Sequence, residues 1–224
     1  MSRRQLVLGA ALALGSCPVC LAQPLSPAGS GAWGIAWTKI PAIGVLSRAD
    51  DGQVQIVREA VAYWNRALAE LGTPFRLGPV THAAGGLPVD QLKTVSDRVL
   101  SRAGPLDLAA NIQEIPGNII VALSDEDFVS FAVRWPNDRK ALVGIKGRSF
   151  YPPTLPNVPR NVIAHELGHA IGLGHNSDPT MLMCGRPASC RPDAFAAPVE
   201  RFFPLASGET AALRTMYPAG WRAL

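Results

Sequence analysis

One eleven-residue stretch, from His165 to His175, contains three of the four histidines in this 224-residue chain. His165 and His169 are four residues apart, so on a helix they lie on the same face, one turn from each other. Two imidazoles in that arrangement can bind one Zn²⁺. A catalytic zinc also needs a third protein ligand and an open position for water. The two histidines therefore predict a helix that carries part of a metal site.

The third ligand in this stretch would be His175, which a continuing helix would carry away from the metal. Gly172 offers a place for the helix to end, because glycine readily adopts positive φ angles. The chain can turn there and bring His175 back toward His165 and His169. Glu166, next to the first histidine, can reach a water at the open position and act as a general base. The stretch thus predicts zinc-dependent hydrolysis.

The stretch resembles the metzincin signature of zinc proteases, H-E-x-x-H-x-x-G-x-x-H, at every fixed position. Met183 adds to the resemblance. It follows the third histidine by eight residues, the spacing at which matrixins, a branch of the metzincins, place a methionine turn beneath the zinc. Met181 is the alternative. The segment Leu205–Pro218 resembles the closing helix of matrixin domains, so the resemblance covers residues 33–218.

The resemblance implies an α+β metzincin fold with a twisted, mixed five-stranded sheet and three helices. The sheet would be mostly parallel with one antiparallel edge strand, and the active-site helix would lie beneath it. The implied activity is that of a metalloendopeptidase, in which the three histidines bind one zinc, Glu166 is the catalytic base and Met183 shapes the floor of the site. A peptide substrate would bind extended along an edge strand, expected within residues 140–148.

Two positions depart from the matrixin pattern. Asn176 follows the third histidine, where vertebrate matrixins usually have serine. Cys184 and Gly185 follow Met183, where a Tyr-Pro or similar pair is common. Astacins and serralysins place a tyrosine ligand two residues past the methionine, and Gly185 cannot supply one, which favours three protein ligands. Two alternatives stay open: an inactive zinc-binding module of the same fold, and a latent enzyme in which Cys184 closes the zinc as a thiolate.

Apolar patterning predicts the elements that position this stretch. A helix capped by Asp50 or Asp51 is expected to run to Leu71, with a stripe of core residues at spacings of three and four. The segment 89–102 is either a helix or an irregular insertion, and Asn157 is a possible cap of the zinc helix. Strands are expected within 33–47, 74–81, 117–124, 128–135 and 140–148, with 128–135 as an edge segment.

Further metal sites have weaker support in the sequence. His82 lies far upstream of the other histidines, as is typical of a surface histidine, and the chain lacks the additional histidines with which some matrixins hold a structural zinc. The consecutive Asp125, Glu126 and Asp127 could bind Ca²⁺, because oxygen clusters suit hard cations. Solvated loop carboxylates are the favoured interpretation of this pattern.

The N-terminus predicts export. Arg3 and Arg4 precede a short apolar run, and Ala22 offers a cleavage site, so residues 1–22 are predicted to be a signal peptide. The arginine pair resembles a twin-arginine signal, although an ordinary secretory signal can also begin in this way. In the alternative reading, Cys17 is the lipidated residue of a lipoprotein, and only then would the chain be attached to a membrane. Residues 23–32 form a flexible lead-in and residues 219–224 a C-terminal tail.

The cysteines and the net charge indicate the compartment and the class of partner. An exported chain favours a disulfide between Cys184 and Cys190, although two free buried thiols are the alternative. The net charge of +4 falls to +2 once the signal is removed. No basic cluster suggests nucleic-acid binding. We therefore expect one monomeric, exported catalytic domain that acts on peptides or proteins.

Overall fold

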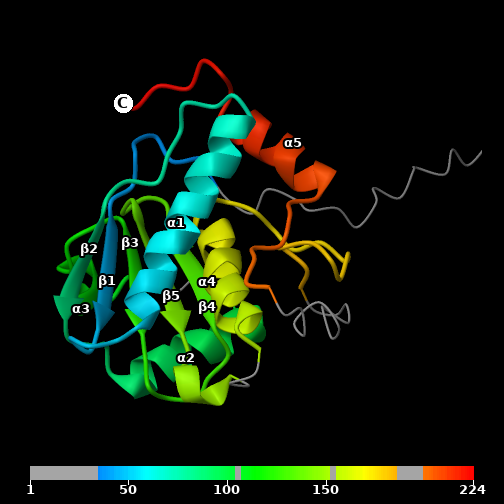
Figure 1. Cartoon of the computed structure of the whole chain (residues 1–224). Helices are drawn as coiled ribbons and strands as arrows, with labels where there is room; N and C mark the ends of the chain where they lie inside the picture. The colour runs from blue at the N-terminus through cyan, green and yellow to red at the C-terminus, as the bar shows by residue number, and fades with distance from the viewer. Residues whose placement is uncertain (1–34, 104–106, 152–154, 186–198) are drawn as a thin grey trace, which may run out of the picture.

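The computed structural model describes residues 35–103, 107–151, 155–185 and 199–224. This part of the chain forms an α+β domain with a five-stranded mixed sheet and five α-helices (Figure 1). The strands are β1 (Ile43–Ser47), β2 (Val80–Ala84), β3 (Ile119–Leu123), β4 (Phe131–Trp135) and β5 (Lys140–Ile145). The helices are α1 (Gln53–Glu70), α2 (Val89–Leu100), α3 (Ala110–Gln113), α4 (Asn157–Ala170) and α5 (Ser207–Met216). The predicted class is confirmed, but α2 and α3 add to the three expected helices.

The strand order is β2-β1-β3-β5-β4. β2, β1, β3 and β5 run parallel, while β4 is antiparallel to β5 and forms one edge. The register places Val45 beside Val121 and Val121 beside Val143. The expectation of a mostly parallel sheet with an antiparallel edge strand is confirmed.

The expectation that residues 140–148 form the edge is wrong. β5 lies between β3 and β4, and all six of its residues are buried. Its continuous apolar run, Ala141–Ile145, is typical of a strand covered on both faces, where alternation is not needed. The edge strand on this side of the sheet is β4, which has three half-buried residues at its centre.

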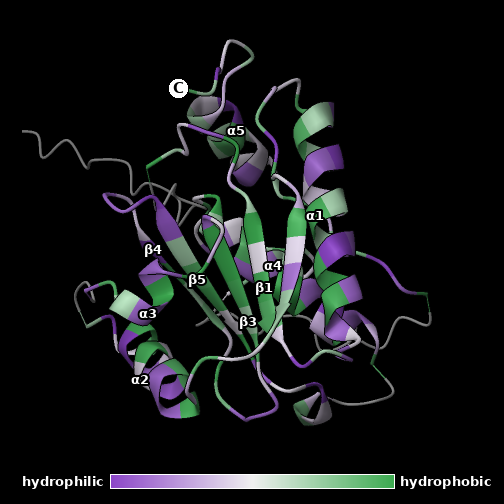
Figure 2. Cartoon of the chain, turned by 90° about the vertical axis from the view of Figure 1, so that its left-hand side faces the viewer, coloured by the Kyte–Doolittle hydropathy of each residue, from purple (hydrophilic) through white to green (hydrophobic). Residues whose placement is uncertain are grey.

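Helices cover both faces of the sheet. Figure 2 shows apolar strands with α1 on one side and with α2 and α3 on the other. Along β3 the side chains alternate, because successive residues of a strand point to opposite faces. Val121 packs in the core shared with α1, α4 and α5, whereas Ile120 packs in the core shared with α2 and α3. The segment 89–102, left open by the sequence, is therefore a helix that covers the second face.

The predicted core stripe of α1 is confirmed. Val57, Trp64 and Leu68 are fully buried against the sheet and α4. The N-cap of the helix is Gly52 and not Asp50 or Asp51 as predicted, although Asp51 Oδ1 accepts a hydrogen bond from the Gln53 N–H at 2.8 Å.

Among the described residues, none of the helices has the length and hydropathy of a membrane span.

The first two strands are shorter than predicted, and β2 is displaced. Proline lacks an N–H group and interrupts a ladder of hydrogen bonds. β1 therefore begins only after Pro41, and β2 begins only after Pro79. The residues between Pro74 and Pro79 instead form an extended segment that buries Phe75 and Leu77 in the core.

Candidate metal centre

Helix α4 positions the candidate site through its apolar side. Ile163, Leu167 and Ala170 are fully buried between the sheet and α1. Trp64 of α1 donates a hydrogen bond from Nε1 to the Ala164 carbonyl at 2.9 Å, which fixes the two helices against each other. The opposite side of the helix carries His165 and His169.

Two asparagines one turn apart on α4 bind the segment 199–203, far away in the sequence. Asn161 is fully buried, donates to the carbonyls of Asn157 and Arg201, and accepts from the Phe203 N–H at 2.7 Å. Asn157 accepts from the Arg201 N–H at 2.8 Å and donates to the Val199 carbonyl. Asn157 is therefore not the predicted helix cap, because its amide is used on a neighbouring segment.

The chain turns sharply after α4. The helix ends at Ala170, and Gly172 has a φ angle of 110°, which favours glycine. A Cβ atom at Gly172 would also lie 2.8 Å from Met216 Sδ, so both conformation and space require glycine there. The turn returns the chain toward the helix, and His175 comes to lie beside the two helical histidines.

The Nε2 atoms of the three histidines converge. The distances are 3.1 Å between His165 and His169, 2.9 Å between His169 and His175, and 3.2 Å between His165 and His175. Nitrogens bound to one tetrahedral zinc at 2.0–2.1 Å are about 3.3 Å apart. The triangle is thus close to the size that a zinc ion requires. Metal sites are usually built from His, Cys, Asp or Glu side chains. In the described part of the chain, these three histidines are the only group of such residues close enough together to bind one metal ion.

Backbone carbonyls orient two of the imidazoles. His165 Nδ1 lies 2.8 Å from the Leu182 carbonyl oxygen, and His169 Nδ1 lies 2.7 Å from the Leu173 carbonyl oxygen. A carbonyl only accepts, so each Nδ1 carries the proton and each Nε2 presents a lone pair to the centre. This is the usual way in which proteins prepare a histidine to bind a metal.

Burial keeps the site uncharged in the absence of a metal. It lowers the pKa of His169 to about 4 and also lowers the pKa of His175. Burial raises the pKa of the Glu166 carboxyl to about 8. Neutral imidazoles are the form that binds a metal, and a nearby cation would favour ionised Glu166. The donor set therefore fits a divalent cation such as zinc.

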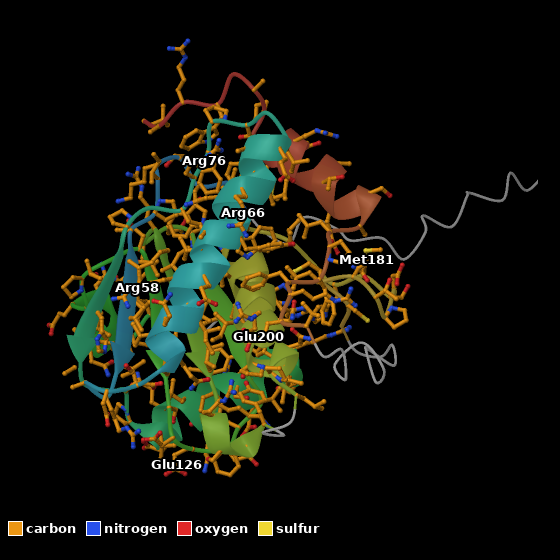
Figure 3. The ribbon with its side chains drawn as sticks, viewed as in Figure 1. Arg58, Arg66, Arg76, Glu126, Met181 and Glu200 are labelled. Atoms are coloured by element: carbon orange, nitrogen blue, oxygen red, sulfur yellow. The ribbon has the colours of Figure 1, made fainter. Side chains whose placement is uncertain are left out.

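Met183 packs directly beneath the histidine helix. It is fully buried, and a Cβ atom at Gly168 would lie only 2.5 Å from its sulfur. Met181, the alternative, is half-buried and lies out to the right of α4 in Figure 3. Gly168 was not singled out from the sequence, although a glycine inside a helix is a signal of close packing.

A buried acid from α5 holds the segment that follows the third histidine. Asn176 donates a hydrogen bond from its amide to Glu209, which is fully buried and also accepts from the Ala206 N–H at 2.7 Å. Asn176 pairs in turn with the chain around Met183, whose carbonyl accepts its N–H at 2.9 Å. Asn176, which stands where serine was expected from the resemblance, is thus held in place by Glu209.

Gly185 packs flat on the third histidine. A Cβ atom there would lie 2.1 Å from the His175 ring, so no side chain fits at this position without a shift. Cys184 is disulfide-bonded, and a disulfide sulfur offers no thiolate to a metal. Cys190 lies outside the described residues, so its pairing with Cys184 stays a prediction.

The other candidate residues lie apart from this centre. His82 is on edge strand β2, and its Nε2 lies 2.9 Å from Ser47 Oγ. Asp125 pairs with Arg48 and Asp127 with Lys146, both at 3.4 Å, and both aspartates are exposed. These acids behave as surface carboxylates in the described chain. The predicted signal and lead-in, residues 1–32, lie outside the described residues.

Sequence reasoning also missed Tyr151. It is buried, its hydroxyl is hydrogen-bonded with Ser130 Oγ at 3.2 Å, and burial raises its pKa to about 12 with a smaller contribution from the charge of Glu166. The segment around it is rich in proline and gave no periodic signal.

No family model and no curated protein matches the chain. One solved structure that it resembles is described as "Structure of a chaperone-substrate complex", with a TM-score of 0.45 and 12% sequence identity. The match covers 81% of this chain and 35% of that one, so the chain spans about a third of its length. A likeness of that size carries no information about function.

Proposed function

We propose that this protein is a zinc-dependent endopeptidase of the metzincin type, with His165, His169 and His175 as the metal ligands. The observation that carries the proposal is the convergence of three Nε2 atoms at 2.9–3.2 Å, two of them oriented by backbone carbonyls. Glu166, which follows His165 in the sequence and is buried, favours catalysis over a purely structural site, because a structural zinc has no use for a carboxylate there.

Three features support the matrixin-like form of the fold. The sheet is mostly parallel with one antiparallel edge strand, and the active-site helix packs beneath β4 and β5. The helix ends in a glycine turn that returns the third histidine. Met183 lies under the helix, against Gly168. The glycine turn belongs to the motif itself, whereas the strand order and the packing of Met183 on Gly168 depend on contacts that the motif does not specify.

The residues of the chain have distinct roles in this mechanism. Zinc, when bound, lowers the pKa of a water and polarises the scissile carbonyl. Glu166 takes a proton from the attacking water and returns it to the leaving amine. Burial raises the pKa of this carboxyl to about 8, and a cation nearby would lower it again. The two opposing effects hold the pKa near neutral pH, where a general base works best.

The substrate would bind along β4. In the described residues β4 pairs with β5 alone, so its outer edge can accept an extended peptide as an added strand. This replaces the segment 140–148 as the expected substrate-binding edge. We also propose that the chain is exported, on the basis of Arg3, Arg4 and the apolar run after them, with loss of residues 1–22.

The proposal is tested with purified mature protein and a broad peptide library. We expect cleavage that a chelator abolishes and that one equivalent of Zn²⁺ per chain restores, with new N-termini identified by mass spectrometry. A protein that binds one zinc through these histidines but cleaves nothing would instead support the inactive binding module. The latent alternative is less favoured, because Cys184 is in a disulfide.

A further inference from the structure

A cavity of about 120 Å³ lies at the end of β4, next to the chain that enters the sheet. Trp37 and Thr38 form one side, and Arg134, Pro136, Arg139 and Lys140 form the other. The lining contains three cations and no acid. The cavity is smaller than a typical site for a whole small molecule, which occupies about 300–1,000 Å³. It therefore suits a single charged side chain better than a cofactor.

Arg134 is the distinctive residue of this cavity. Its guanidinium stacks on the Trp37 ring, 5.0 Å from the centroid. Its Nη1 also lies at the turn after α4, 3.4 Å from where a Cβ atom of Gly172 would be. Its Nε and Nη1 are buried, and neither has a hydrogen-bond partner in the described structure. Two buried N–H donors of the Arg134 guanidinium can thus bind a ligand. Leaving such donors without a hydrogen bond costs stability.

The neighbouring cations are not equivalent to Arg134. Lys140 donates from Nζ to the carbonyls of Ile115 and Gly117, so its donors are largely used within the fold. Arg139 lies in the β4–β5 turn with a positive φ of 52° and is exposed. These two residues add positive potential at the mouth, while Arg134 offers the directed donors.

The position of Arg134 connects this cavity to the substrate edge. Arg134 belongs to β4, and its side chain points to the face of the sheet that packs on α4. Residues directly opposite each other on paired strands point to the same face, with Cβ atoms about 4.5–5.5 Å apart. A peptide residue paired opposite Arg134 would therefore extend its side chain toward the guanidinium, close to the end of the histidine helix.

We propose that this cavity is a specificity subsite for an aspartate or glutamate side chain of a peptide bound along β4. The inference rests on the proposed endopeptidase function and names its substrate class. A carboxylate matches the guanidinium fork, which binds such groups through two parallel hydrogen bonds. A basic substrate side chain at the same position would be repelled by the three cations.

The test compares peptides that differ only by glutamate or glutamine at one position, scanned across either side of the scissile bond. With the zinc-loaded wild-type protein, glutamate at one position should raise kcat/KM about tenfold over glutamine, as one charge-assisted interaction in a partly desolvated site would. Arg134→Met, which keeps the stem that packs on Trp37, should abolish that difference.

Arg58→Met is the matched control. Arg58 is an exposed arginine on α1, labelled in Figure 3, and its loss should leave the glutamate preference intact. Arg134→Lys should keep part of the preference, because it retains the charge but not the fork. This second variant keeps the test valid if Arg134→Met does not fold.

The outcomes separate the two claims. A wild-type enzyme that cleaves the glutamine peptides but shows no preference for glutamate at any position would overturn the subsite and leave the endopeptidase function standing. A preference that survives in Arg134→Met equally overturns it. A zinc-loaded protein that cleaves no peptide of either kind would refute the endopeptidase function, and the subsite with it.

Discussion

Glu166 combines a catalytic role with a structural cost. Its carboxyl is buried without a metal beside it, so its pKa rises from 4.5 to about 8. An unfolded chain at neutral pH ionises this group freely, whereas the metal-free fold must keep it protonated. A residue that is unfavourable for folding and well placed for proton transfer is typical of an active site.

Replacing this acid by glutamine should stabilise the metal-free protein. Because the pKa of this carboxyl is raised in the fold, its contribution to the free energy of unfolding is fully present below pH 4.5. That contribution is lost as the pH rises from 4.5 through about 8. At pH 7, Glu166→Gln should therefore raise the free energy of unfolding by up to about 3 kcal/mol. The gain should disappear near pH 4.5.

Urea denaturation of chelator-treated protein at several pH values measures this difference. The effect of His169 on stability has the opposite sign. Because the pKa of His169 is lowered in the fold, the free energy of unfolding falls as the pH drops from 6.5 to about 4. That effect is common to both proteins and cancels in the comparison. Equal stabilities at pH 7 would show that Glu166 is not buried in this way.

Gly168 fixes the distance between the histidine helix and Met183. Gly168→Ala places a methyl group within about 2.5 Å of the methionine sulfur and 2.9 Å of the Trp64 ring. We expect a loss of about 1–3 kcal/mol, as for other overpacked cores, together with weaker zinc binding. Thermal unfolding and a zinc-competition titration check this prediction. In a Met183→Ala background, Gly168→Ala should cost much less than in the wild type if the clash is with the sulfur.

At the scale of elements, the site depends on segments that join α4 from far along the chain. The histidine spacing and the glycine turn are local, so they were readable from the sequence. The role of Asn157 was misread as a cap because its partners, near Arg201, lie more than forty residues away. The edge strand was misassigned because strand order depends on long-range pairing, although the apolar run of β5 is itself typical of an interior strand. The α+β class needed only local patterns.

The asparagine pair on α4 gives an element-scale prediction. Asn161→Ala removes three interior hydrogen bonds, those with the Phe203 N–H and with the carbonyls of Asn157 and Arg201. Each such bond contributes about 0.5–1.5 kcal/mol, so a total loss of about 3 kcal/mol is expected. Chemical denaturation measures it. Ser207→Ala, at the exposed start of α5, is the control and should change little. A near-neutral Asn161→Ala would show that this clamp is not formed.

For the whole molecule, hydrogen bonds from α5 hold the segment that follows the third histidine. Cys184 is disulfide-bonded beside the third histidine, and Glu209 of α5 holds Asn176 in the same region. The second sheet face is closed by α2 and α3, which were not among the three expected helices. Their apolar residues are only a few per helix, and the sequence pattern was too short to decide between a helix and an insertion.

The predicted partner of Cys184 is Cys190. Non-reducing peptide mapping of the exported protein should find these two residues linked. The small loop should stabilise the fold by less than the roughly 3 kcal/mol of a 15-residue loop. Reduction should therefore lower the melting temperature modestly and leave zinc bound. Two alkylatable thiols in the native protein would reject the disulfide and revive the latent form with Cys184 on the metal.

The most direct test of the central claim measures zinc content and turnover together in three proteins. The wild type should hold one zinc per chain and cleave peptides. Glu166→Gln should keep the zinc, because Glu166 is not a ligand, and lose turnover by about 10²–10⁴-fold. His169→Ala should lose both, because two imidazoles bind zinc weakly. Wild-type turnover in Glu166→Gln, or full zinc content in His169→Ala, would contradict the account.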